Sequence, residues 1–375
     1  MAVPKRTKKH PTNTQISIPA DTELVGLVFE LTPQAADYLY AQYTIGLHAW
    51  FLDQVRQTNP ELSAYLHDGQ SEKPFAISSL EGSLQSFGQD FKLNVDTTYR
   101  WYVNAFSQPL VEWISQWLQT LPEVISLRNA PLQIRSCKIA LAPTNYSELF
   151  NIPRPTPATV RLSFLSPTSF RRKGHHFPLP VPNNIFHSYL RRWNDFSGMN
   201  FEQEKFLEWV EDCVLIARHK LESVKVVAGK KGMVTGFTGA VEFSLSSKAS
   251  QQPEFEKLFY ALGRLAPYCG TGHKTTFGLG QTRLGWLLEE AFSVSSMQNM
   301  LAERIAQLTE EFISQRKRIG GTRATEIAET WATILARREL GESLQAIASD
   351  LEMPYQTVKT YAKLARRALT PAENT

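Results

Sequence analysis

Two histidines of this sequence stand where their side chains could transfer protons. His48 lies in the segment Gly46-Leu-His-Ala-Trp-Phe51, beside the apolar stripe of a predicted helix rather than within it. His67 follows in a polar segment that leads to Lys73. Because the unperturbed pKa of imidazole is about 6.5, histidine can act as a general acid or a general base near neutral pH. A single histidine usually has a structural or solvated role, so these residues alone do not define a reaction.

A glycine-rich stretch, residues 263–286, has the composition of an anion-binding turn. Glycine lets a ligand approach the main chain closely, and successive backbone N–H groups beside a lysine suit a phosphate. The stretch has neither the third glycine of a dinucleotide fingerprint nor the Gly-Lys-Ser/Thr of a P-loop. It therefore predicts either a phosphate-binding turn before a strand or a purely structural hairpin. The residues concerned are Gly270, Gly272, His273, Lys274, Gly278 and Gly280.

Several basic clusters could together form a track for an RNA backbone, because closely spaced lysines and arginines neutralise phosphates. They are Arg171, Arg172 and Lys173, then Arg191 and Arg192, then Lys230 and Lys231, with Lys274. His175, His176 and His273 lie in the same regions as Cys269. They lack the spacing of zinc ligands, and a second cysteine is missing. We therefore predict no metal site and no cofactor.

Composition places further bounds on the chain. Its 375 residues, 42% hydrophobic and 20% charged, predict two or three globular domains. A formal net charge of +4 permits a nucleic-acid partner without requiring one. Cys137, Cys213 and Cys269 are too few and too widely spaced for a disulfide framework, which favours free thiols in the cytoplasm. We find no apolar run long enough for a membrane span and no signal peptide, so no membrane partner is expected.

Residues 21–150 are predicted to form one ferredoxin-like unit. An apolar residue at every fourth position from Leu39 to Phe51 predicts a helix, for which Thr32-Pro33 is a start signal and Asn59 follows the end. A second helix is predicted over residues 109–121. The predicted strands are residues 24–31, 73–78, 99–106 and 132–141. This β-α-β-β-α-β order is the split βαβ arrangement.

Residues 151–292 are predicted to repeat that order after a proline-rich linker, Asn151–Pro157. Strands at 159–165, 214–227, 233–245 and 275–284 alternate with helices at 182–193, 201–210 and 254–265. The segment Ala228–Gly232, with its two lysines, is predicted to be the tip of a hairpin.

Residues 293–375 are predicted to be an all-helical domain of helix-turn-helix type, and residues 1–20 a flexible basic arm. The predicted helices at 343–351 and 354–369 have the required spacing, and Ala348 and Val358 fit small and β-branched core positions. Glu352 stands in the turn where glycine is usual. The last helix carries only basic charges, which favours contact with DNA or RNA over packing on a protein partner. These charges are Lys359, Lys363, Arg366 and Arg367.

The two predicted units, their basic loops and the glycine-rich loop resemble one known family over about residues 20–290. It is the CRISPR-associated endoribonucleases that cut precursor CRISPR RNA within its repeats, members of the repeat-associated mysterious protein superfamily. The strongest match is Gly270-Thr-Gly-His-Lys-Thr-Thr-Phe-Gly-Leu-Gly-Gln281. Supporting stretches are residues 73–75, 78–80, 166–170 and 186–194. The resemblance implies an α+β fold of two tandem ferredoxin-like (RRM-like) βαββαβ domains, with the helix-turn-helix tail outside it.

The resemblance implies a metal-independent endoribonuclease that binds the repeat and retains the mature crRNA. The 2′-hydroxyl would attack the adjacent phosphate and leave a 2′,3′-cyclic phosphate and a 5′-hydroxyl. His48 matches the position of the family's catalytic histidine, which implies a role as general acid or base, with His67 as the second choice. Because the family's active sites vary in residue type, Tyr40, Tyr43 and Lys73 remain equal candidates for the assisting group.

Two other functions remain open from the sequence. A protein with the same fold could hold crRNA without cutting it, as a subunit of a larger interference complex. Alternatively, the tail could make the chain a DNA-binding targeting or regulatory protein, or a docking site for another subunit.

Overall fold

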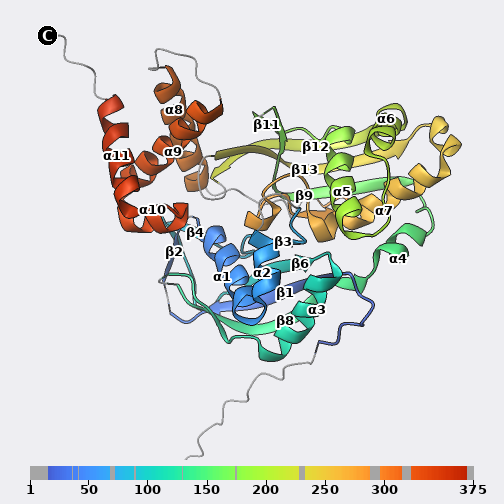
Figure 1. The fold of residues 1–375 in the computed structure, drawn as a ribbon, viewed down its shortest axis with the longest axis horizontal. Helices are drawn as coiled ribbons and strands as arrows, with labels where there is room; N and C mark the ends of the chain where they lie inside the picture. Colours follow the sequence, from blue (N-terminus) through green and yellow to red (C-terminus); the bar gives the residue numbers. More distant parts are fainter. Residues whose placement is uncertain are drawn as a thin grey trace, which may run out of the picture.

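The computed structural model contains two mixed α/β units and a helical tail (Figure 1). It describes residues 16–35, 37–40, 42–67, 72–87, 90–128, 130–173, 175–227, 233–287, 296–314 and 322–369. The basic arm, apart from its last residues, and the lysine-bearing hairpin tip predicted at 228–232 lie outside these ranges. The α+β class and the two ferredoxin-like units are confirmed, as is the all-helical tail.

The N-terminal unit has a five-stranded antiparallel sheet in the order β3-β6-β1-β8-β7. Its strands are β1 (Leu24–Pro33), β3 (Phe75–Ile77), β6 (Tyr99–Ala105), β7 (Val124–Ile125) and β8 (Leu132–Thr144). Its helices are α1 (Tyr43–Thr58), α2 (Pro60–His67), α3 (Gln108–Trp117) and α4 (Tyr146–Asn151), with the 3-10 turn η1 (Leu118–Thr120). A small separate sheet contains β2 (Tyr38–Tyr40), β4 (Gln85–Phe87) and β5 (Asp90–Lys92).

The predicted start of the first helix is wrong. Thr32 and Pro33 extend strand β1, where they pair with Gln133 and Leu132 of β8. Pairing with a distant strand thus outweighs the local preference of Thr-Pro for a helix start. Helix α1 begins only at Tyr43.

Helix α1 is fixed on the sheet by the apolar face that the sequence predicted. Tyr43, Leu47 and Phe51 are buried, and the Phe51 ring lies 5.1 Å from that of Phe75 in β3. Helix α3 adds Trp117, which packs edge-on against Phe51. His48 lies next to this face on α1, so its position is determined by how α1 packs on the sheet.

The C-terminal unit has a four-stranded antiparallel sheet in the order β12-β13-β9-β14. Its strands are β9 (Thr159–Thr168), β12 (Val214–Val227), β13 (Met233–Leu245) and β14 (Thr282–Leu284). Its helices are α5 (Pro182–Phe196), α6 (Gln203–Cys213) and α7 (Pro253–Cys269), with the 3-10 turns η2 (Ser247–Gln251) and η3 (Thr275–Phe277). A short hairpin contains β10 (Phe170–Arg172) and β11 (His175–Phe177). The last strand is shorter than predicted because residues 275–281 form η3 and a loop.

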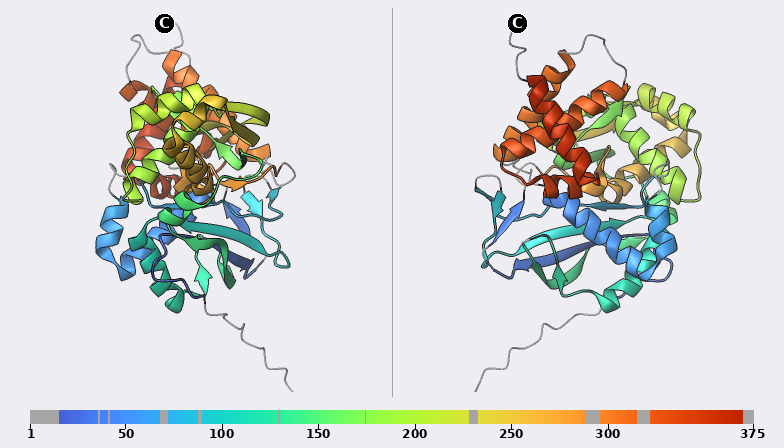
Figure 2. Two further views of the ribbon diagram at one scale, coloured as in Figure 1. Left: turned by 90° about the vertical axis from the view of Figure 1, so that its right-hand side faces the viewer. Right: turned by 60° about the vertical axis from the view of Figure 1, so that its left-hand side comes forward.

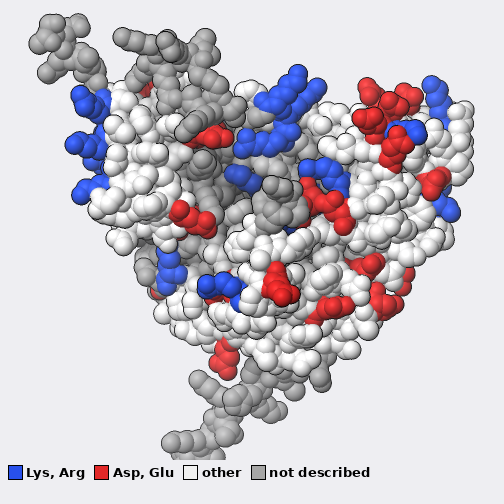
Figure 3. Space-filling model, viewed as in Figure 1, with Lys and Arg blue, Asp and Glu red and all other residues white. Residues whose placement is uncertain are grey.

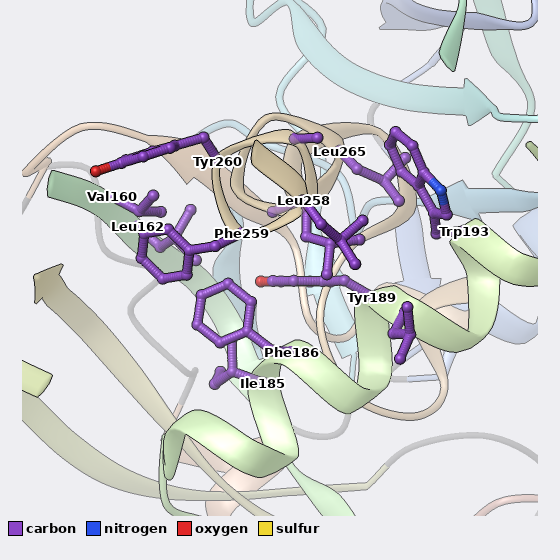
Figure 4. Packing of buried hydrophobic residues seen from close by; sticks show 14 of the residues in the cluster. Val160, Leu162, Ile185, Phe186, Tyr189, Trp193, Leu258, Phe259, Tyr260 and Leu265 are labelled. Atoms are coloured by element: carbon purple, nitrogen blue, oxygen red, sulfur yellow. The ribbon is translucent and has the colours of Figure 1, made fainter. Parts of the chain in front are cut away.

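The core of this unit lies between α5, α7 and the sheet (Figure 4). Phe186 of α5 packs against Phe259 of α7, with ring centroids 4.8 Å apart. Tyr189 and Trp193 follow on the same face of α5 and are fully buried. Because α7 leads directly into the glycine-rich loop, this packing also fixes where that loop starts.

The tail contains α8 (Ser296–Ser314), α9 (Thr322–Glu339), α10 (Leu344–Leu351) and α11 (Tyr355–Leu369). Helices α9, α10 and α11 share one small apolar core. Ala348 and Val358 are buried in it, as predicted. Glu352 has φ = +50° between α10 and α11, so a glutamate adopts the left-handed conformation that glycine usually provides in this turn.

The tail packs on both units: on the β12–β13 hairpin of the C-terminal unit and on the N-terminal unit near Arg128 (Figures 1 and 2). Val227 and Met233, at the described end of the β12–β13 hairpin, join the apolar cluster of α8 and α9. On the other side, Arg128 of the N-terminal unit pairs with Asp350 of α10 and lies 3.9 Å above the Tyr40 ring. Asp350 also pairs with the fully buried Arg337 at 2.6 Å.

Among the helices of the described residues, none is long and apolar enough to cross a membrane.

Candidate functional site at the junction of the two units

His48 meets the glycine-rich loop of the other unit. Its Nδ1 atom lies 2.9 Å from the main-chain oxygen of Thr276, a residue 228 positions further along the chain. Its ring stacks on Phe277, with centroids 4.2 Å apart and planes at 27°. On another side the Phe75 ring lies 5.9 Å away, nearly parallel at 23°. The imidazole is therefore half-buried between aromatic groups from both units.

The contact with Thr276 selects one tautomer of His48. A carbonyl oxygen can only accept a hydrogen bond, so Nδ1 carries the proton and donates it. In the neutral ring Nε2 then carries the lone pair and is the atom that can act as a base. The same carbonyl would also stabilise the protonated ring, because the negative end of its dipole faces the imidazole.

The glycine-rich loop reaches His48 because its glycines allow close backbone contacts. Gly272 and Gly280 have φ of +78° and +67°, and a Cβ at either would lie about 2 Å from a backbone oxygen (2.2 Å from that of Ser169 and 2.0 Å from that of Thr271). Gly278, with φ = +83°, forms an isolated parallel bridge with Ser78 of the N-terminal unit. Glycine at these positions is therefore required by geometry, and the loop serves as the junction between the units.

The backbone amides of this loop are used inside the protein. Thr271 donates to Gly280, His273 to Ser169 and Gly280 to Pro167. Gly272 donates to the hydroxyl of Ser188 at 3.0 Å. Of the two alternatives that the glycine pattern predicted, the use of these N–H groups inside the protein favours the structural one, and RNA contact by this loop stays a prediction.

Arg192 also belongs to the loop's support rather than to an RNA surface. Its side chain is only 4% exposed, and it donates to the main-chain oxygen of Gly272 at 2.8 Å and to the Ser188 hydroxyl at 2.7 Å. Glu72 balances its charge at 3.6 Å and also pairs with the half-exposed Arg191 at 2.9 Å. The prediction that Arg192 contacts RNA is therefore wrong, because its donors are bound inside the fold.

Comparison with known proteins agrees with this architecture. Residues 25–119 match the family model described as the CRISPR Cas6 N-terminal domain, and residues 162–282 match that of the CRISPR-associated endoribonuclease Cas6. The two models fall on the two units and together cover more than half of the chain. The chain belongs to the Cas6 family.

Solved Cas6 structures are similar to the same part of this chain. A Cas6 in a product complex is 27% identical in sequence to this chain, with a TM-score of 0.54. The match covers 70% of this chain and 99% of that Cas6. The same Cas6 in a substrate-mimic complex is 26% identical with a TM-score of 0.52, again with 70% and 99% covered. A Thermus thermophilus Cas6 is 25% identical with a TM-score of 0.50, and the shares are also 70% and 99%. No curated protein sequence matches the chain.

The tyrosines suggested as assistants of His48 are occupied elsewhere in this Cas6-family fold. Tyr43 is 1% exposed, its hydroxyl accepts from the amide of Leu80, and burial raises its pKa to about 12. Tyr40 lies under Arg128, and burial raises its pKa to about 12 as well. Tyr43 is a core residue, so its assignment as an assistant is wrong. Tyr40 instead belongs to the contact between the N-terminal unit and the tail.

The two remaining candidates, His67 and Lys73, differ in exposure and in their neighbours. His67 is the last residue of α2 and is exposed. Lys73 lies between Glu72, which pairs with α5, and Phe75, which faces His48. Lys73 is partly buried in this segment, and its role as an assistant of His48, like that of His67, stays a prediction.

The other basic residues divide into exposed and partly buried groups. Arg171, Arg172 and Lys173 are exposed on the β10–β11 hairpin, which packs beside the glycine-rich loop. Lys274 is partly buried and has φ = +61° immediately before η3. Lys230 and Lys231 lie outside the described residues. The space-filling view shows lysines and arginines on the face between the tail and the C-terminal unit, with acidic side chains among them (Figure 3).

His273 stacks on His176 of the hairpin, with ring centroids 5.3 Å apart. Its Nδ1 donates to the main-chain oxygen of Ser169 at 2.8 Å. Burial lowers the pKa of both histidines to about 4, and nearby positive charges act in the same direction. Both rings are therefore neutral at neutral pH and cannot supply positive charge to a phosphate.

Among the described residues no three His, Cys, Asp or Glu side chains gather as a metal-ligand set. Cys269 is buried, burial raises the pKa of its thiol to about 12, and its Sγ donates to the oxygen of Gly270.

The groups that hold the His48 ring were not found from the sequence. Thr276 and Phe277 lie in the stretch that was singled out, but its glycines suggested a backbone site rather than a stacking ring. Phe75 follows Lys73-Pro in a stretch used only for the family resemblance. No spacing rule links residues of two different units, so only the tertiary structure could reveal these neighbours.

Proposed function

We propose that this chain cleaves the repeat of precursor CRISPR RNA without a metal ion, with His48 as the group that transfers the proton. One observation carries the proposal: Thr276 and Phe277 hold the His48 ring so that Nδ1 keeps its proton and Nε2 carries the lone pair. The family membership supports an RNA-cleaving enzyme. Among the similar structures are a product complex and a mutant of the same Cas6 with one histidine changed to alanine.

The reaction requires only one bond exchange. His48 Nε2 takes the proton from the 2′-hydroxyl, whose oxygen attacks the neighbouring phosphorus. The bond from phosphorus to the 5′ oxygen then breaks, and that oxygen takes up a proton, from the imidazolium or from water. The products are a 2′,3′-cyclic phosphate and a 5′-hydroxyl. A cation stabilises the extra negative charge in the transition state, and Lys73 and Lys274 are the candidates nearest in sequence to the groups around His48.

We infer that the RNA backbone crosses the junction of the two units. Arg171, Arg172 and Lys173 lie on the exposed hairpin that contacts the glycine-rich loop through His176 and His273, and Arg191 and Lys274 add positive charge. His48 contacts the same loop through Thr276 and Phe277. Binding at several phosphates would allow the enzyme to retain the mature crRNA after the cut, because those contacts do not involve the broken bond.

The direct test is cleavage of a repeat RNA in EDTA under single-turnover conditions. Wild type is expected to cut, and a deoxyribose at the nucleotide upstream of the cut is expected to block the reaction. His48→Ala should reduce the rate at least about 100-fold while the dissociation constant for the repeat changes little. His67→Ala is the matched control and should retain the wild-type rate. Full cleavage by His48→Ala, or a requirement for a divalent ion, would refute the mechanism.

A second function is favoured by the closed backbone of the glycine-rich loop. The amides of Thr271, Gly272 and Gly280 donate to groups inside the protein, so they cannot stabilise the charge of a phosphorane. A junction with this loop would also suit a subunit that holds crRNA inside an interference complex and does not cut it. Tight binding of the repeat with no cleavage in any buffer would establish that function instead.

A further inference from the structure

Helix α11 exposes basic and polar side chains along its length, together with Tyr355 and Leu364. Figure 3 shows lysine and arginine side chains along the edge of the molecule that α11 forms, on the side away from the two units. The helix contains no acidic residue. Its buried positions, Val358, Ala362 and Ala365, pack on the rest of the tail. The exposed positions include Gln356, Lys359, Thr360, Lys363 and Arg367.

Three acidic residues of the tail form ion pairs away from α11. Glu339 pairs with Arg304 of α8 at 2.7 Å, and Glu342 pairs with Arg337. Asp350 pairs with Arg337 and with Arg128 of the N-terminal unit. These pairs hold the tail together and to the N-terminal unit, whereas α11 carries four basic residues and no acidic one.

The shape of this region fits one partner. Helices α10 and α11 are joined by a tight turn at Glu352 and share a core with α9, which is the helix-turn-helix arrangement. A helix of 15 residues is about 22 Å long and about 10–12 Å wide with its side chains. The major groove of B-form DNA, roughly 12 Å wide, admits such a helix, whereas the deep and narrow major groove of A-form RNA does not.

We propose that α11 is a second nucleic-acid site and that its ligand is double-stranded DNA. Lys359, Lys363 and Arg367 contact phosphates, and the Gln356 amide on the same face can donate to and accept from base edges. The Thr360 hydroxyl donates to the main-chain oxygen of Gln356, so it can accept from a base edge. The site is distinct from the RNA-cleaving junction, because His48, Thr276 and Phe277 belong to the two ferredoxin-like units. The contacts of Asp350 hold the tail on the body, so the DNA would be bound beside the nuclease.

The test measures binding of a labelled random-sequence DNA duplex to the full chain at several salt concentrations. The variant Lys359→Ala/Lys363→Ala/Arg367→Ala is expected to bind at least about 10-fold more weakly. The slope of log affinity against log salt should fall by about 0.9 for each phosphate that the variant no longer neutralises. An unlabelled RNA duplex of equal length should compete at least about 10-fold less well than DNA. Cleavage of the CRISPR repeat, followed in parallel, should keep its wild-type rate.

The matched control removes the same charge from another surface. Lys205→Ala/Lys248→Ala/Lys257→Ala changes three lysines of the C-terminal unit and should leave DNA binding unchanged. Equal weakening in the two variants would mean that only net charge matters, which would overturn the proposal. So would failure of the wild-type chain to bind DNA at low salt, or equal competition by the RNA duplex. Absence of RNA cleavage with intact DNA binding would bear on the proposed nuclease function alone.

Discussion

The imidazole of His48 is held by a hydrogen bond to Thr276 and by the rings of Phe277 and Phe75, and the first two groups come from the C-terminal unit. Thr276 fixes the tautomer through its main-chain oxygen, which no substitution removes. Phe277 fixes the orientation of the ring, and its side chain can be changed. The relative importance of orientation for the reaction can therefore be measured at Phe277.

Phe277→Ala should lower the single-turnover rate by about 10-fold to 100-fold, because a small displacement of a catalytic group has a cost of this order. The dissociation constant for the repeat should change less, since Phe277 carries no charge. Phe277→Tyr keeps a ring of the same shape and should restore most of the rate. If the alanine variant cleaves as fast as wild type, the stacking has no part in positioning His48.

The stacked pair of His176 and His273 makes the stability of the glycine-rich loop depend on pH. The pKa of each ring is about 4 in the folded chain and near 6.5 when unfolded, so the unfolded state binds more protons between these values. Stability should therefore be full above about pH 6.5 and should decrease as the pH falls toward 4. Each unit of pKa difference corresponds to at most about 1.4 kcal/mol.

His273→Gln should make the urea midpoint less sensitive to pH over that range. His219→Gln, a change at an exposed histidine of β12, is the control and should keep the wild-type dependence. Identical pH profiles for wild type and His273→Gln would contradict this account.

At the scale of elements, the glycine-rich loop has three structural roles. It ends α7, it bridges to Ser78 of the other unit, and it supplies Thr276 and Phe277 to His48. Substitutions in the loop should therefore affect the rate of the chemical step as well as RNA binding.

Gly280→Ala and Gly198→Ala separate backbone conformation from crowding. Their φ values are nearly equal, +67° and +69°, but a Cβ at Gly280 would lie 2.0 Å from the Thr271 oxygen, whereas nothing lies within 4 Å of one at Gly198. Gly198→Ala should lower the unfolding free energy by only about 1–2 kcal/mol. Gly280→Ala should cost clearly more and should slow cleavage at saturating enzyme. Denaturant midpoints and single-turnover rates measure both; equal effects in the two variants would exclude crowding as the cause.

The predictions from sequence succeeded where local pattern decides and failed where distant partners decide. The apolar face of α1 and the core positions Ala348 and Val358 follow from spacing alone. The helix start at Thr32-Pro33 was wrong because β8, a hundred residues later, extends β1. His48 was proposed through a family resemblance, and the ring that stacks on it comes from the other unit, which no local pattern indicates. Arg192 was read as a surface charge because one of its buried acceptors, the main-chain oxygen of Gly272, lies 80 residues away in the sequence.

For the whole molecule, the tail is part of the same packed body as the two units. It covers Val227 and Met233 of the β12–β13 hairpin and contacts Arg128 beside Tyr40, whose hydroxyl faces Gly46 of α1. Removing residues 293–375 would expose these groups to water, so a deletion would change more than DNA binding. A point change at the contact is the cleaner way to release the tail.

Asp350→Ala should release the tail from the N-terminal unit. It removes a carboxylate, 9% exposed, that pairs with Arg128 and with the fully buried Arg337. Arg337 keeps its pair with Glu342, so the cost should stay below about 3–5 kcal/mol, the cost of a buried charge left without any partner. Amide hydrogens of α10 and α11 should exchange faster, while those of α1 and α7 change little.

Arg304→Ala breaks the half-exposed pair with Glu339 and should cost only about 0–1 kcal/mol. Equal exchange in the two variants would mean that the apolar contacts of α8, rather than Asp350, hold the tail on the body.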